Sequence, residues 1–249
     1  MHNLIGRLVF SLVVVTIPAL AISESTILDS QLVSSEEQGS LRQAPPISQW
    51  VLPQYSAEEQ NQILAQFNHL DPQHVVPTQA LMQALLYWHA NQDRITNKKS
   101  LTVIDFTQHS SKKRLYLIDL QSGMVTATWA AHGSGSDKNA DGFAEQFSNV
   151  DGSHASSLGF FYAAELYYSY TYKSNALRLD GLSQTNSLAR SRAIVIHSAN
   201  YVSESWLNQY GKMGRSYGCP ALDQKIKDFV INKITGGSLL YIWAGQAEF

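Results

Sequence analysis

Hydrophobic and polar positions change their spacing several times along this 249-residue chain. Nearly every side chain from residue 8 to residue 20 is apolar, whereas Ser, Gln and Pro dominate residues 22–53 without a regular period. Between residues 56 and 91 apolar positions recur every three or four residues, which predicts amphipathic helices. From residue 101 onward short apolar runs alternate with turns rich in Gly, Ser and Asn, which predicts strands.

Two helices are expected before the strands. The first spans residues 56–67, where Ser56 is the predicted N-cap and Glu59 completes a capping box. The second spans residues 77–91 and begins with a proline, which suits the first turn of a helix. Its apolar side chains at i, i+3, i+4 and i+7 share one face, formed by Leu81, Ala84, Leu85 and Trp88.

Short strands account for most of the remaining chain. We expect strands at residues 101–106, 114–120, 124–131, 177–179, 193–196 and 238–243, and a short helix at residues 223–234. Residues 121–123 contain Gly123 and are typical of a hairpin turn. Alternation predicts that Tyr168, Tyr170 and Tyr172 share one strand face. The result is a mostly β domain with short helices, preceded by two small helices.

The first residues are typical of a targeting segment. One cation, Arg7, precedes the apolar run, and the small residues Ala19 and Ala21 follow it, as in a secretory signal peptide over residues 1–21. An uncleaved membrane anchor is the alternative. No later apolar run is long enough to span a membrane. We therefore expect a bacterial protein that is exported to the periplasm or cell envelope.

Composition narrows the possible classes of protein. The formal net charge is -2, without a block of like charges, which argues against nucleic-acid binding because that function requires a basic surface. Hydrophobic residues make up 44% and charged residues 15% of the chain, so a folded domain is expected. The single cysteine, Cys219, cannot form an internal disulfide. It is either a reactive thiol or a small buried apolar residue.

Two segments contain the residue types of thiol chemistry. A strand of apolar residues ends at His197, and a tight polar segment, Gly214–Pro220, contains Cys219. A neighbouring imidazole promotes thiolate formation and later protonates the leaving amine. Gly218 leaves room for backbone N–H groups beside the nucleophile to bind an oxyanion. Spacing alone leaves open a structural His197 bonded to a backbone carbonyl.

The two segments resemble the catalytic signature of L,D-transpeptidases with a YkuD-type domain. Tyr217 stands where the larger branch has His, Ser198 stands where it has Gly, and the distance from His197 to Cys219 is longer. These departures agree better with a second branch, the murein L,D-transpeptidase catalytic domain proteins. The resemblance to this branch covers residues 75–245 and includes Asn97–Leu120, Ala131–Gly133, Phe147–Asn149, Ser153–Gly159, Leu177–Leu182, Tyr201–Ser203 and Gly214–Ala221.

The resemblance implies a YkuD-like β-sandwich with Cys219 as nucleophile and His197 as base, and Ser198 as a third member that orients the ring. It implies peptidoglycan stem peptides as partners and no cofactor. Attack on the third residue of a stem tetrapeptide would release D-Ala, and transfer to an amine would give a 3→3 crosslink. The oligomeric state and the acceptor stay undetermined. So do the roles of the linker or arm, residues 22–55, and of the helical segment, residues 56–95, before the catalytic domain, residues 96–249.

Other residues near these motifs are candidates for substrate contact. Arg215 is suited to a substrate carboxylate, although a surface ion pair is equally consistent with its position. The remaining candidates are Ser216, Tyr217 and Gly218 in the cysteine segment and Asn149 and His154 in the polar loop, residues 132–157. His132, His154 and His197 lack the spacing of metal ligands, so no metal is expected.

Two other functions fit the same fold. An L,D-carboxypeptidase or endopeptidase would use water in place of an amine acceptor. A non-catalytic cell-wall binding protein would keep the groove without the chemistry. The pair of Cys219 and His197 favours an enzyme over the binding protein.

Overall fold

The computed structural model describes residues 43–246, which belong to one compact unit, and the predicted signal peptide lies outside this part. The strands are β1 Ser100–Asp105, β2 Leu115–Asp119, β3 Val125–Thr128, β4 Gly159–Ser169, β5 Ser174–Gly181, β6 Val195–Ser198, β7 Ala221–Leu222 and β8 Ser238–Trp243. The helices are α2 Ala57–Ala65, α3 Thr78–Ala90, α4 Glu204–Tyr210 and α5 Gln224–Ile234. Three short 3₁₀ turns are η1 Ile47–Gln49, η2 Ser134–Ser136 and η3 Gln184–Asn186.

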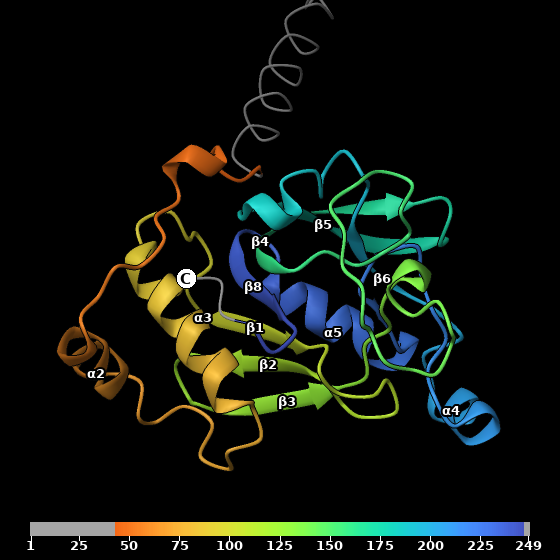
Figure 1. Ribbon diagram of the computed structural model, residues 1–249, viewed down its shortest axis with the longest axis horizontal. Coiled ribbons are helices and arrows are strands. Elements are labelled where there is room, and N and C mark those ends of the chain that lie inside the picture. The colour runs from red at the N-terminus through yellow and green to blue at the C-terminus, as the bar shows by residue number, and fades with distance from the viewer. Residues whose placement is uncertain (1–42, 247–249) are drawn as a thin grey trace, which may run out of the picture. The chain divides into compact units, whose positions relative to one another are not determined.

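The eight strands form one sheet in the order β3-β2-β1-β8-β4-β5-β6-β7 (Figure 1). Only the β1–β8 and β6–β7 pairs are parallel among the described strand pairs. A β-bridge between Ala131 and Ala221 joins the segment after β3 to β7 at the other end of this order. The sheet therefore curves until its two edges meet, and this arrangement confirms the predicted fold class.

Alternation along the strands gives the sheet two apolar faces. On β8, Leu240 and Ile242 belong to the inner cluster, whereas Leu239 and Tyr241 belong to the outer one. Helix α3 covers the outer face, where the ring of Tyr87 stacks on Phe160 with centroids 3.7 Å apart. Burial of both faces explains why most strands contain continuous apolar runs.

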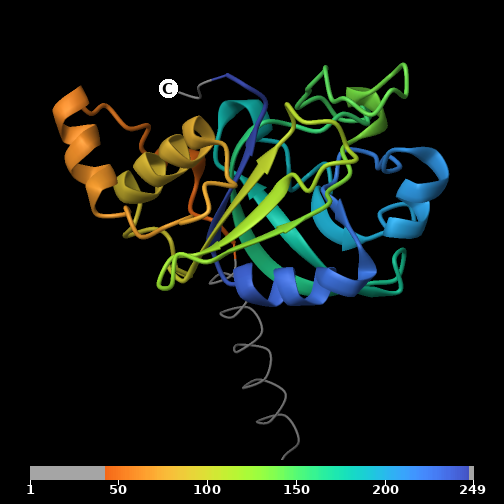
Figure 2. The ribbon, with the colours of Figure 1, turned by 90° about the horizontal axis from the view of Figure 1, so that it is seen from below.

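Helix α5 lies along one side of the curved sheet (Figure 2). Asp223 caps it by accepting a hydrogen bond from the Lys225 N–H, and Val230, Ile231 and Ile234 enter the inner cluster. The predicted capping box of α2 is also present, because Ser56 and Glu59 exchange hydrogen bonds. The helix boundaries predicted from the sequence agree with these observed helices to within a few residues.

The tyrosine-rich segment differs from the prediction. Tyr168, Tyr170 and Tyr172 do not share one strand face, because β4 ends at Ser169 and the next four residues form the turn into β5. Tyr170 at this turn is 88% exposed, whereas Tyr172 is partly buried. The prediction failed because the alternating tyrosines continue past the end of β4, where the chain leaves the strand and turns.

The chain before α2 is an arm that packs on the catalytic part. Trp50 is buried in the outer cluster, and the Ala44 N–H donates to the Asp180 carboxylate. Fully buried Asn91, after α3, accepts from the Val51 N–H and donates to the Val51 and Tyr87 carbonyls, at 2.8–2.9 Å. One amide side chain therefore holds the arm at Val51, in addition to the contacts of Ala44 and Trp50.

Within residues 43–246, none of the helices is both long and apolar enough to cross a membrane.

Replacing Asn91 with Ala should lower the free energy of unfolding by about 2–3 kcal/mol, because the Val51 backbone groups lose their partners. Urea unfolding measures this change, and limited proteolysis should cleave the arm faster. The control is Asn232→Ala on the exposed face of α5, expected to change stability by less than about 0.5 kcal/mol. Equal stability of the two variants would contradict this role of Asn91.

Candidate active site

His197 lies on β6, a strand of β-branched residues between β5 and β7. The side chain is buried, and Nδ1 lies 2.9 Å from the Ser198 carbonyl oxygen. A carbonyl only accepts, so Nδ1 carries the proton and Nε2 is the basic nitrogen of the neutral ring. Burial lowers the pKa of His197, and this bond partly opposes that effect. The backbone of Ser198, rather than its hydroxyl, thus orients the ring.

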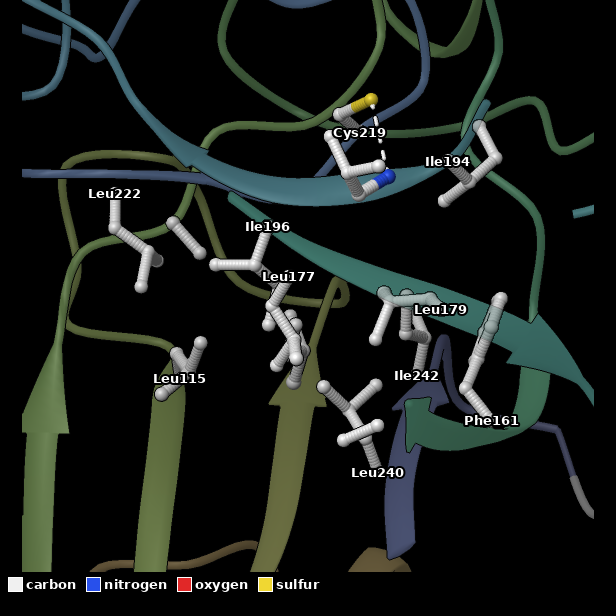
Figure 3. Close-up of a cluster of buried hydrophobic side chains, with 14 of the residues drawn as sticks. Leu115, Phe161, Leu177, Leu179, Ile194, Ile196, Cys219, Leu222, Leu240 and Ile242 are labelled. Carbon is white, nitrogen blue, oxygen red and sulfur yellow. Dashed lines mark hydrogen bonds between the residues drawn. The ribbon is translucent and has the colours of Figure 1, made fainter. Parts of the chain in front are cut away.

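Cys219 precedes β7, whose register aligns His197 with Ala221. The sulfur accepts a hydrogen bond from the Val195 N–H at 3.4 Å and lies 3.6 Å from the Ala193 carbonyl oxygen. Figure 3 shows Cys219 and Ile196 on opposite sides of the β6 ribbon. The residue is 7% exposed, and burial raises the pKa of its thiol. Both members of the pair are therefore neutral in this state of the site.

Tyr172 is the aromatic neighbour of His197. Its ring stacks on the His197 imidazole with centroids 3.8 Å apart and planes 5° from parallel. Its hydroxyl also lowers the pKa of the Cys219 thiol, against the larger effect of burial. Sequence reasoning placed Tyr172 on a strand face and missed this position. No short motif marks it, because it lies in the turn between β4 and β5, far from His197 and Cys219 in sequence.

The cysteine loop is held by its own side chains and by the segment after β3. Ser216 Oγ donates to the Cys219 carbonyl at 2.6 Å and accepts from the Gly218 N–H at 3.1 Å. Gly218 has φ +112°, and a Cβ there would lie 2.7 Å from the Ala155 carbonyl oxygen. Glycine is therefore required by both conformation and space. The Gly218 N–H is engaged, whereas the Cys219 N–H has no hydrogen-bond partner among residues 43–246.

A buried charged network lies behind this loop. The guanidinium of Arg114 donates to His132 Nδ1 at 2.6 Å, and His132 Nε2 lies 3.2 Å from the Asp137 carboxylate. Arg114 also donates to the carbonyls of Ala130 and Gln108. This network orders the segment after β3. The backbone of that segment bonds the cysteine loop in turn, since the Ser216 N–H donates to the His132 carbonyl at 2.9 Å.

The network fixes the protonation state of His132. Nδ1 accepts from Arg114, so Nε2 carries the proton and donates to Asp137. Burial and the positive charge of Arg114 lower the pKa of His132 from 6.5 to about 4. Burial also lowers the pKa of Arg114 to about 9, although Asp105 and Asp137 oppose this shift. The imidazole is therefore a neutral link between a cation and an anion.

The other residues predicted to contact substrate occupy different positions around the cysteine loop. Tyr217 is 74% exposed and stacks on His154, so these two form one aromatic pair on the surface beside the cysteine loop. Arg215 donates to the Asp137 backbone carbonyl. Asn149 bonds the backbone of Gln184 and Leu188 and the hydroxyl of Ser187, so it ties the polar loop to η3.

Within residues 43–246, no group of three or more His, Cys, Asp or Glu side chains is arranged to hold a metal ion. His132 faces Arg114, and His197 faces Tyr172.

The sequence matches the family model of the L,D-transpeptidase catalytic domain over residues 72–243. The chain therefore belongs to this family of enzymes, which confirms the family and enzyme class predicted from the segments around His197 and Cys219.

Similar solved structures include an L,D-transpeptidase from Mycobacterium smegmatis, with 14% identity, TM-score 0.36 and 59% of both chains covered. L,D-transpeptidase 3 from Mycobacterium tuberculosis, solved with a faropenem-derived adduct, shares 13% identity, with TM-score 0.37 and 58% of this chain and 60% of that chain covered. An L,D-transpeptidase from Stackebrandtia nassauensis shares 14% identity, with TM-score 0.35 and 79% and 82% covered. The first two matches thus span about three fifths of those chains. No curated protein matches the sequence significantly.

Acid should destabilise the fold through His132. The unfolded chain takes up a proton near pH 6.5 and the folded protein only near pH 4, so stability falls as pH decreases across this window. Buried His197 contributes in the same direction. His132→Gln, compared with the wild type by urea unfolding at several pH values, should show a shallower decline. The exposed control His74→Asn should retain the wild-type slope, and an equally steep slope for His132→Gln would contradict the assignment.

Removing the Tyr172 hydroxyl should raise the pKa of the Cys219 thiol, because this hydroxyl lowers that pKa in the wild type. Cys219 is the sole cysteine, so the pH dependence of alkylation by iodoacetamide reports on this thiol alone. Tyr172→Phe keeps the ring on His197 and should shift the alkylation profile to higher pH. Tyr170→Phe, in the exposed turn, is the matched control. Coincident profiles for Tyr172→Phe and the wild type would contradict this effect of the hydroxyl.

Proposed function

We propose that this protein is an exported L,D-transpeptidase that acts on peptidoglycan stem peptides through a Cys219 thioester. The observation that carries the proposal is the register of β6 and β7, which brings the segment of Cys219 alongside His197 within a domain of this family. Covalent acyl transfer needs a nucleophile and a base on neighbouring segments of this kind.

The first step is acylation by a donor stem tetrapeptide. His197 Nε2 accepts the thiol proton while the sulfur attacks the carbonyl carbon of the third residue. The C–N bond to D-Ala then breaks, and His197 returns the proton to the leaving amine. The Cys219 N–H is a donor for the oxyanion that forms in between. Both side chains are neutral before the substrate binds. The thiol therefore still carries its proton, and the imidazole is able to accept it.

Substrate access requires a change around Cys219. The residue is only 7% exposed, and Tyr172, in the turn between β4 and β5, stacks on His197. A donor carbonyl reaches the sulfur only if the side chains that cover it move aside.

The domain arrangement extends this proposal. Residues 1–21 act as the export signal, residues 22–55 form the linker and arm, residues 56–95 form the helical segment, and residues 96–249 form the catalytic domain. The packed arm and helices α2 and α3 contribute to the outer core rather than to the sulfur's surroundings. Export supplies the compartment in which peptidoglycan is available.

Incubation of the purified chain with disaccharide-tetrapeptide should give a Cys219 acyl adduct with loss of D-Ala, followed by 3→3 dimers. Intact-protein and product mass spectrometry detect both. Cys219→Ala should abolish the adduct, and His197→Gln should lower its rate of formation by about 100- to 10,000-fold. The matched control is Cys219→Ser, which preserves the fold and should form at most a trace of adduct. Tripeptide without dimers would indicate a carboxypeptidase, and bound tetrapeptide without an adduct would indicate a binding protein.

A further inference from the structure

Arg192 is a half-buried cation in the turn between η3 and β6. Its guanidinium donates to three oxygens of the polar loop, which are the Ser148 carbonyl at 2.8 Å, the Ala155 carbonyl at 2.7 Å and the Ser153 hydroxyl at 3.2 Å. One nitrogen of the planar group binds Ser148, and another binds Ser153 and Ala155. A single side chain therefore holds both ends of residues 148–155.

Ala155 connects this side chain to the cysteine loop. The Ala155 carbonyl oxygen lies 2.7 Å from the position that a Cβ on Gly218 would occupy, and Gly218 immediately precedes Cys219. The next hydroxyl along the chain, of Ser156, donates to the Gly218 carbonyl at 3.2 Å. This part of the polar loop therefore lies against the cysteine loop, and Arg192 holds it there.

The backbone that follows Arg192 contacts the sulfur itself. The carbonyl oxygen of Ala193, the next residue, lies 3.6 Å from Cys219 Sγ, and the Val195 N–H donates to the same sulfur at 3.4 Å. Ala193 has φ 54°, in the left-handed region, and a residue with a Cβ keeps such a conformation only where its surroundings hold it. Arg192 therefore has contacts on two sides of Cys219, through its own backbone neighbour and through the carbonyl that meets Gly218.

The positive charge of Arg192 is not neutralised by a bound carboxylate. Its three hydrogen-bond partners are uncharged oxygens, and it forms no salt bridge with any residue in the described range 43–246. Burial lowers the pKa of its guanidinium, whereas the negative charges of Asp151 and Cys219 oppose this shift. A guanidinium remains protonated at neutral pH, so an unpaired positive charge lies near the sulfur.

The other titratable groups around the thiol carry no charge at neutral pH. Burial raises the pKa of the Tyr172 and Tyr201 phenols and lowers the pKa of the His197 imidazole. Burial also raises the pKa of the Cys219 thiol, and the charge of Arg192 is among the effects that lower it. Arg192 is therefore the side chain that supplies positive charge to the thiol.

We propose that Arg192 is a positioning residue for the nucleophile, which holds the polar loop against the cysteine loop and keeps a positive charge beside the Cys219 sulfur. Its hydrogen bonds fix the orientation of the sulfur toward an incoming carbonyl. Its charge stabilises the thiolate that forms when the thiol proton passes to His197 Nε2. The part of this role that concerns acylation rests on the proposed function, whereas the effect on the thiol does not.

The experiment follows alkylation of Cys219 by iodoacetamide in the purified full chain, which requires no substrate. The rate of alkylation against pH gives a midpoint, which reports on the pKa of the thiol, and a plateau at high pH, which reports on its accessibility. The variants are Arg192→Lys and Arg192→Gln. Both lose the planar fork, but only the lysine keeps the charge. The difference between their midpoints therefore isolates the effect of charge from the effect of a loosened loop.

Both variants should raise the plateau rate by about threefold to tenfold, because the polar loop no longer holds the cysteine loop over the thiol. The midpoint should lie about 0.5–1 pH unit higher in Arg192→Gln than in Arg192→Lys. Acylation by disaccharide-tetrapeptide, followed by mass spectrometry, should be slower by about tenfold to a hundredfold in Arg192→Gln. Faster alkylation together with slower acylation is the signature of a displaced nucleophile.

Two further variants are controls. Arg94→Gln removes a half-buried guanidinium from the segment after α3 and should match the wild type in all three measurements. Ser153→Ala removes one oxygen that Arg192 binds but keeps the charge, so it should raise the plateau rate by about twofold. Ser153→Ala also keeps the test decisive if far-UV circular dichroism shows that either Arg192 variant is unfolded, since an unchanged plateau would then overturn the proposal.

The remaining outcomes separate this proposal from the proposed function. Coincident midpoints for Arg192→Lys and Arg192→Gln would overturn the role of the charge, and a wild-type plateau in both would overturn the role of the hydrogen bonds. Equal changes in Arg94→Gln and Arg192→Gln would overturn the assignment to this position. No acyl-enzyme in the wild type would overturn the proposed function, while the alkylation profiles would still decide whether Arg192 acts on the thiol.

Discussion

The main-chain pairing between residues 131–134 and 216–221 determines where Cys219 lies. Hydrogen bonds from Ser216 to His132 and from Ala131 to Ala221 bring the segment after β3 onto the cysteine loop. This pairing closes the curved sheet, so the fold and the position of Cys219 are consequences of the same contacts. The buried Arg114–His132–Asp137 network keeps one partner in place. Loosening of that network would free the backbone segment to which the cysteine loop is bonded.

Burial determines the protonation states of the titratable side chains near this main-chain pairing. It raises the pKa of the Cys219 thiol and lowers the pKa values of His197 and His132, which keeps all three groups neutral. Charge is concentrated instead at Arg114 and Asp137 behind the loop, and at Arg215 and Lys212 beside it. The interior thus separates the neutral side chains of Cys219 and His197 from the charged side chains that hold the backbone.

Local signals in the sequence predicted the elements that depend on local chemistry. The capping box at Ser56 and Glu59, the hairpin at Gly123 and the helix after Asp223 agree with the structure. The sequence predicts the pair of His197 and Cys219 because both residues lie in short ordered motifs.

Other features required three-dimensional information. Tyr172 reaches His197 only because the turn between β4 and β5 folds over the sheet, and no periodicity records such a contact. Arg114 belongs to a strand pattern and gives no sign that it bonds His132. Helix α4 is too short and too polar to have a clear apolar period, so it was not predicted.

The burial of the Cys219 thiol has a consequence for its resistance to oxidation. Oxidants attack thiolates, and they attack exposed ones first. Cys219 has no second cysteine with which to form a reversible disulfide, so damage beyond sulfenic acid would be permanent. A buried, protonated thiol is protected from such damage. Burial thereby lowers the reactivity of the thiol and lengthens the lifetime of each molecule.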